Sequence, residues 1–108
     1  MKTETVQQRE QKILRECIRI IREHLNPGRI ILFGSRAKPG GGLEKRSDFD
    51  LAIDNKDKVN FRTERKLKEA IEKISGLYKV DIVFLNTVDE RFRSIILKTG
   101  EIVYGKES

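Results

Sequence analysis

Two aspartates, Asp48 and Asp50, stand at the head of a short apolar run and are the residues best suited to chemistry in this sequence. Side chains two positions apart on a strand point to the same side, so both carboxylates face one way. Their Cα atoms lie about 6.6 Å apart at roughly 3.3 Å per residue, close enough for the carboxylates to share metal ions. Phe49 between them points to the opposite side, into the core. This pattern predicts an active site that holds divalent cations.

A third aspartate, Asp81, interrupts a later apolar run, KVDIVFL at residues 79–85. A charge within an apolar strand is costly unless something compensates it, and a bound cation would do so. Hard cations such as Mg²⁺ prefer carboxylate oxygens and keep water and substrate phosphate as their other ligands. In two-metal nucleotidyl transfer, ions roughly 4 Å apart bind the attacking and leaving oxygens. We therefore expect two Mg²⁺ ions, bridged by Asp48 and Asp50, with Asp81 on the ion that activates the attacking hydroxyl.

A glycine-serine pair, Gly34-Ser35, ends the unbroken apolar run at residues 30–33. Glycine lets the backbone approach a phosphate, and the backbone amides and the Ser35 hydroxyl can donate hydrogen bonds to its oxygens. Arg36 or Lys38 is then placed to neutralise a leaving pyrophosphate. A Walker-type phosphate loop is excluded, because no Gly-Lys-Ser/Thr follows the glycines. These residues predict that a nucleotide with a phosphate chain is the substrate.

Each of these signals has an ordinary structural explanation when it is taken alone. Two acids at a strand start often cap a turn, a glycine-serine pair often ends a strand, and Asp81 could pair with a lysine. Joined in this order, with strands on either side, the three signals favour metal-dependent nucleotide chemistry.

Hydrophobic periodicity predicts the elements that must position these residues. They are helices at 3–25, 60–75 and 88–98 and strands at 29–33, 48–54, 79–85 and 102–104, the last at a sheet edge, with a short helical turn at 36–38. Helices alternating with strands predict an α/β fold, and the length predicts one domain over residues 1–108.

The composition limits the setting in which this chemistry takes place. The net charge of +6 suggests an anionic partner such as a nucleotide, a nucleic acid or an acidic protein surface. One cysteine, Cys17, excludes an internal disulfide and is compatible with a reducing cytosol. No secretory signal or membrane-spanning run is visible, so we expect a cytoplasmic protein without a membrane partner. His24, near a helix C-terminus, is assigned no catalytic role.

The segments Gly34-Ser35-Arg36-Ala37 and Ser47-Asp48-Phe49-Asp50-Leu51 together resemble the signature of the DNA polymerase β-like nucleotidyltransferase superfamily. In particular the chain is similar to the minimal nucleotidyltransferases (MNT), which are often encoded beside a HEPN-domain partner. The resemblance runs nearly the whole chain, through Val80-Asp81-Ile82 to the segment 95–104. It implies an α+β nucleotidyltransferase fold, a short mixed sheet of about four strands with helices packed on it.

The same resemblance implies a reaction and roles for individual residues. The reaction is transfer of a nucleoside monophosphate from a nucleoside triphosphate with Mg²⁺, releasing pyrophosphate. Gly34 and Ser35 would hold the triphosphate, Asp48 and Asp50 would bind both metals, and Asp81 would complete the metal site. One departure concerns Lys38-Pro39-Gly40, which stands where arginine-glycine is common. Lysine keeps the charge without the fork geometry of arginine, a change that affects the efficiency of transfer more than metal binding.

The acceptor of the transferred group leaves three hypotheses open. The resemblance favours an antitoxin that binds a HEPN ribonuclease and adenylylates a tyrosine on it, blocking its RNA site with a bulky anion. A second possibility is a subunit that neutralises its partner by contact alone. A third is a nucleotidyltransferase for RNA or a small molecule, with the acceptor domain supplied by another chain. We expect a hetero-oligomer with the HEPN protein, leave a homo-oligomer open, and expect no direct nucleic-acid binding.

Overall fold

The computed structural model describes residues 5–34 and 48–106 and shows all seven expected elements. They are α1 (Val6–His24), β1 (Arg29–Phe33), β2 (Phe49–Asp54), α2 (Phe61–Ser75), β3 (Val80–Phe84), α3 (Glu90–Thr99) and β4 (Glu101–Gly105). Their ends differ from the predicted ones by a few residues, and the turn predicted at 36–38 lies outside the described residues. Within the described ranges, no helix has the length and apolar character needed to cross a membrane.

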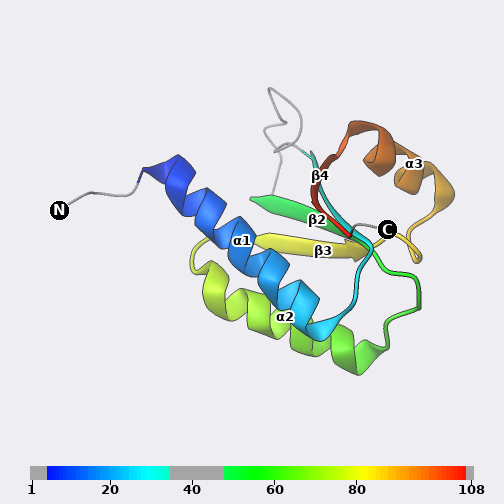
Figure 1. The fold of residues 1–108 in the computed structure, drawn as a ribbon, viewed down its shortest axis with the longest axis horizontal. Coiled ribbons are helices and arrows are strands. Elements are labelled where there is room, and N and C mark those ends of the chain that lie inside the picture. Colours follow the sequence, from blue (N-terminus) through cyan, green and yellow to red (C-terminus); the bar gives the residue numbers. More distant parts are fainter. Residues whose placement is uncertain (1–4, 35–47, 107–108) are drawn as a thin grey trace.

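The four strands form one mixed sheet in the order β3-β2-β1-β4 (Figure 1). Strand β1 pairs antiparallel with both β2 and β4, while β3 runs parallel to β2 after the crossover through α2. Strands β3 and β4 are therefore the two edges, and the prediction that the last strand lies at an edge is confirmed. The predicted mixed sheet with helices packed on it is confirmed as well.

Each face of the sheet is covered by its own helices, with α1 and α2 on one side and α3 on the other (Figure 1). Ile30 and Leu32 of β1 pack in the cluster under α1 and α2, whereas Ile31 packs with Ile96 of α3. Successive residues of a strand point to opposite faces. A strand covered on both faces must be apolar at every position, which explains the unbroken run at residues 30–33.

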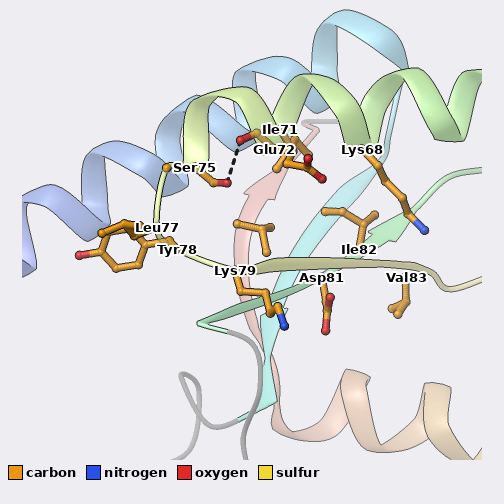
Figure 2. Close-up of a pocket in the computed structure, with 12 residues that line it drawn as sticks. Lys68, Ile71, Glu72, Ser75, Leu77, Tyr78, Lys79, Asp81, Ile82 and Val83 are labelled. Carbon is orange, nitrogen blue, oxygen red and sulfur yellow. Dashed lines mark hydrogen bonds between the residues drawn. The ribbon is translucent and has the colours of Figure 1, made fainter.

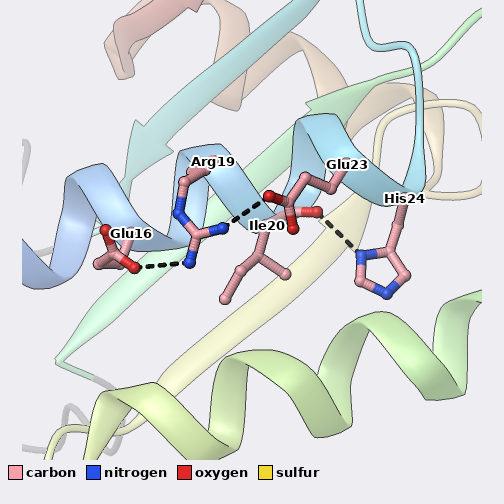
Figure 3. A network of polar contacts seen from close by, with 5 residues as sticks. All are labelled: Glu16, Arg19, Ile20, Glu23 and His24. Carbon is pink, nitrogen blue, oxygen red and sulfur yellow. Dashed lines mark hydrogen bonds and ion pairs between the residues drawn. The ribbon is translucent and has the colours of Figure 1, made fainter.

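Helix α1 begins at a capping box and exposes a charged face. The Thr5 side chain accepts a hydrogen bond from Gln8 N (3.0 Å), and the Gln8 side chain accepts one from Thr5 N (2.9 Å). Further along, Arg19 bridges Glu16 and Glu23 at 2.7 and 2.6 Å, and its hydrogen bond lowers the pKa of Glu16 (Figure 3). The exposed His24 bonds through Nδ1 with Ile20 O, a structural role.

Helix α3 sits on the sheet through very few side chains. Ile96 is its only buried residue among those described. Phe92 and Ile95 are 37% and 46% exposed. The helix ends at Gly100, where an added Cβ would press on the Ile31 side chain and lie 2.7 Å from Ile96 O. Gly100 therefore permits α3 to approach β1 closely.

Candidate active site

Asp50 and Asp81 are neighbours across the parallel pair of β2 and β3. The register pairs them directly, as it pairs Phe49 with Val80 and Leu51 with Ile82. Paired residues of adjacent strands share a face and lie about 4.8 Å apart, so both carboxylates project from the same side of the sheet. That side carries α3, because Ala52 lies two residues after Asp50 and packs against Ile96.

Phe33, at the end of β1, continues this row. It pairs with Asp50 across the antiparallel ladder and thus stands on the same face. Its ring meets the ring of Phe92 from α3 edge to face, at 5.8 Å between centroids and an interplanar angle of 79°. The contact between the two rings ties α3 to the end of the sheet where Asp50 lies.

Asp48 is held at the start of β3 through Lys79. Its backbone N–H donates to Lys79 O at 2.8 Å, and its carboxylate Oδ2 accepts from Lys79 N at 2.9 Å. Asp48 is half-buried and lies just before β2. This reciprocal pair of hydrogen bonds brings all three aspartates to one end of the sheet, since Lys79 directly precedes β3.

The carboxylates at this end of the sheet provide some of the oxygen ligands that a hard divalent cation needs. Among residues 5–34 and 48–106, no group of three or more His, Cys, Asp or Glu side chains is arranged to hold a metal ion. The described residues present a carboxylate pair, Asp50 and Asp81, with Asp48 held nearby on Lys79. Like charges on directly paired strand positions repel, and a cation bound by both would remove that repulsion. The metal-binding roles of the three aspartates stay a prediction.

Asp81 is exposed, so the prediction that its charge lies in an apolar surrounding and needs compensation was wrong. Strand β3 lies at the sheet edge, and Asp81 projects to the face carrying α3. On that face the apolar cluster contains Val83 and Leu85 and does not reach back to residue 81. The charge of Asp81 therefore has access to water, and its burial cost is no argument for a cation.

Gly34 ends β1 with a φ of 79°, in the region that favours glycine. The backbone thus turns sharply at the end of the strand whose last residue pairs with Asp50. Ser35, Arg36 and Lys38, the other predicted nucleotide-binding residues, lie outside the described residues. Their roles, like that of Gly34, stay predictions.

A pocket of about 540 Å³ borders the site along the outer side of β3 (Figure 2). Its lining includes Asp81 and Lys79 from the strand side and Ile71, Glu72 and Ser75 from α2. Sequence reasoning missed this pocket, and it also missed Lys79 as the backbone partner of Asp48. No side-chain pattern signals either feature, because one depends on strand order and the other on main-chain atoms.

Comparison with known proteins agrees with this architecture. The profile of the family described as Polymerase beta, Nucleotidyltransferase matches residues 15–108. The "Probable protein adenylyltransferase MntA" of Haemophilus influenzae is 39% identical over 75 residues, which cover 69% of this chain and 64% of that protein. The chain thus matches less than two thirds of that relative's length.

Two solved structures share the fold. One, named as a minimal nucleotidyltransferase, is 30% identical with a TM-score of 0.60 and covers 94% of this chain and 95% of its own. The other is a chain of the complex between tri-AMPylated Shewanella oneidensis HEPN toxin and MNT antitoxin, with a TM-score of 0.69. It is 20% identical and covers 89% of this chain and 72% of its own, which shows likeness of fold alone. With the family profile spanning most of its length, this chain belongs to the Polymerase beta nucleotidyltransferase family.

Proposed function

We propose that this chain is a protein adenylyltransferase that transfers AMP from ATP to a tyrosine hydroxyl of a HEPN-domain toxin and so acts as its antitoxin. The observation that carries the proposal is the direct pairing of Asp50 with Asp81 at the sheet end where β1 turns at Gly34. Carboxylates beside a glycine turn are what a metal-bound triphosphate requires. The proposal is further supported by the name of the Haemophilus influenzae relative, a protein adenylyltransferase.

Different residues are assigned to the metal ions and to the phosphates. Asp48, Asp50 and Asp81 would hold Mg²⁺, with two ions expected, and the metal supplies charge neutralisation at the phosphates. Gly34 lets the backbone come close to the triphosphate, with Ser35 donating to phosphate oxygens and Arg36 and Lys38 balancing the leaving group. Phe33 and Phe92 support the carboxylate row from the α3 side.

The reaction breaks one phosphoanhydride bond of ATP and forms one phosphoester bond to the acceptor. The acceptor hydroxyl oxygen forms a bond to the α-phosphorus of ATP, and the bond from that phosphorus to the oxygen bridging to the β-phosphate breaks. Pyrophosphate leaves with the electron pair, and the hydroxyl proton is lost to solvent. Asp81 is exposed, so an acceptor carried by another protein can reach this end of the site.

The choice of acceptor rests on the relatives. The Shewanella oneidensis complex contains an AMPylated HEPN toxin bound to an MNT antitoxin, and its matching chain has the fold described above. An AMP group on a tyrosine adds a bulky anion where a ribonuclease would bind RNA, which excludes the RNA by charge and size. The chain's net charge of +6 also favours an acidic partner surface.

Neutralisation by contact alone is a second candidate, and one observation favours it. Exposed apolar side chains lie on α3 and β4, namely Phe92, Ile95, Leu97 and Ile102. Apolar surface of this kind is common where proteins associate. A subunit that binds through it could block a toxin without any transfer.

One experiment separates these functions. The purified chain is incubated with Mg²⁺, ATP labelled on its α-phosphate, and a HEPN-domain protein as the candidate acceptor. Label on a tyrosine of the HEPN protein is the expected result. A tight complex without label would replace the transferase proposal with contact neutralisation. Label found only on RNA or on a small molecule would overturn the proposed acceptor.

A further inference from the structure

Strand β3 presents an open edge beside the site. Phe49 N donates to Lys79 O, and Leu85 N donates to Ile53 O, so the odd-numbered residues around β3 carry its bonds to β2. In a parallel pair these bonds fall on alternate residues of a strand. The N–H and C=O groups of Val80 and Ile82 therefore face outward, and no described strand pairs with them. The carbonyl oxygen of Phe84, the last residue of β3, already accepts hydrogen bonds from Thr87 N and Val88 N.

The pocket described above lies along this same stretch of edge, since residues 79–83 line it. Figure 2 shows Ile82 pointing toward α2, and Lys79 and Asp81 pointing to the other side of the strand. Leu77 adds a fully exposed apolar side chain at one end. An outward row of peptide groups with an apolar wall is the arrangement that takes an extended peptide as an added strand.

We propose that the acceptor protein docks an extended segment on the outer edge of β3, hydrogen-bonded to Val80 and Ile82, with the acceptor hydroxyl carried opposite Asp81. The inference rests on the proposed function and names how its acceptor is held. The pocket is continuous with the site, because Asp81 both lines the pocket and pairs with Asp50.

Strand geometry sets where the hydroxyl falls. The N–H and C=O of Asp81 face β2 and are not available to an added strand. If the added strand runs antiparallel to β3, Asp81 and the residue opposite it therefore form a non-hydrogen-bonded pair. In such pairs the Cα atoms are about 4.5 Å apart and the side chains are close. Both side chains project to the same face, the face that carries Asp50. A tyrosine at that position thus projects from the face that carries the carboxylates of Asp50 and Asp81.

The small size of the edge favours a transient substrate over a second copy of this chain. Strand β3 has five residues, and only Val80 and Ile82 offer both of their peptide groups to the open edge, because Phe84 O is already bonded. A stable dimer buries on the order of 1,600 Å², far more than so short a strand pair offers. A few main-chain hydrogen bonds suit a segment that binds, reacts and leaves.

The test compares Val80→Pro with Val80→Ala, using the HEPN-domain protein as acceptor. Proline at position 80 removes an outward N–H and leaves the bonds to β2 intact, while both variants lose the valine side chain. We expect the KM for the acceptor to be at least about tenfold higher in Val80→Pro than in Val80→Ala, with equal ATP affinity. Equal KM values in the two folded variants would overturn the inference.

Amide hydrogen exchange gives an independent test. It is measured on the wild-type chain in the absence of ATP, once alone and once with the HEPN protein. The amides of Val80 and Ile82 are expected to become protected in the complex, whereas those of Asp81 and Val83 are slow in both states. Protection of Val80 and Ile82 in the free chain would indicate a second copy on the edge, and no protection in the complex would indicate docking elsewhere. Either result overturns the inference. Protection without label transfer would refute the proposed function alone.

Discussion

Asp50 and Asp81 face each other across the parallel pair of β2 and β3, although α2 separates them along the chain. The crossover brings the carboxylate of Asp81 beside that of Asp50. Lys79, two residues before Asp81, accepts a hydrogen bond from Asp48 N and donates its own N–H to the Asp48 carboxylate. A short helix crossover thus assembles an acidic sheet end from residues far apart in the sequence. The proposed chemistry depends on this pairing.

Replacing Asp50 with Asn should remove several kcal/mol of transition-state stabilisation, or about a thousandfold in the rate of AMP transfer. The fold should remain, because Asp50 is half-buried at a strand end. Asp57→Asn, an exposed position outside the carboxylate row, is the matched control. Label transfer measures the rate, and melting curves check the fold. Full activity in the Asp48→Asn/Asp50→Asn double variant would refute the assignment.

Asp81→Asn should also abolish the stabilisation that Mg²⁺-ATP gives. A ligand at about 100 times its Kd adds about 2.7 kcal/mol to the free energy of unfolding. Without ligand, the melting temperature should barely change, because Asp81 is exposed and substitutions at such positions stay within about 0.5 kcal/mol. An unchanged thermal shift with Mg²⁺-ATP in this variant would remove Asp81 from the site.

Gly34→Ala should weaken ATP binding and destabilise the fold. The φ of 79° at this position costs a residue with a Cβ about 1–3 kcal/mol, so an alanine would strain the backbone at position 34 or change its conformation. Titration calorimetry with ATP and Mg²⁺ measures the binding, and Gly28→Ala is the control, since a Cβ there meets Asp54 O at an ordinary 3.6 Å. Wild-type affinity in Gly34→Ala would show that the turn plays no part.

Gly100→Ala should lower stability through α3. The added methyl would press on Ile31 and lie 2.7 Å from Ile96 O and 3.2 Å from Leu32 O, and backbone oxygens cannot move aside. Overpacking of this kind costs about 1–3 kcal/mol, which corresponds to a fall of roughly 10 °C in Tm for a domain of this size. A melting temperature equal to that of Gly28→Ala would mean that α3 does not pack as described.

Cys17 should make the protein less stable in alkali. Burial raises the pKa of its thiol from 9.0 to about 12, so the unfolded chain loses the proton first. The stability that comes from keeping this thiol protonated is complete below pH 9. As the pH rises from 9 to 12 it is lost, and the free energy of unfolding falls by up to about 1.4 kcal/mol per pH unit. Urea unfolding at several pH values should show this slope in the wild type and a shallower one in Cys17→Ala. Parallel curves would contradict the burial of the thiol.

Local patterns predicted the elements well, because each core contact leaves its own period in the sequence. The unbroken apolar run of β1 is typical of a strand covered on both faces, and Ile30 and Ile31 do pack into separate clusters. Helix α1 ends at His24, shortly before Pro27, which cannot continue a helix, and Cys17 is buried on its apolar side. These features depend on neighbours within a few residues.

The features that depend on strand order could not be predicted from such local patterns. Nothing local shows that Asp50 and Asp81 are register partners, or that β3 is an edge with Asp81 exposed. The resemblance of Gly34-Ser35 and Asp48-Phe49-Asp50 to a known signature predicted which residues form the site, and their roles stay a prediction. The geometry within it, including the bond between Asp48 and Lys79, came from the fold.

The most direct measurement is a crystal structure of the chain with Mn²⁺ in place of Mg²⁺ and a non-hydrolysable ATP analogue. We predict anomalous density between the analogue's phosphates and the carboxylates of Asp48, Asp50 and Asp81. Three carboxylates pointing apart, with no metal density among them, would contradict the account.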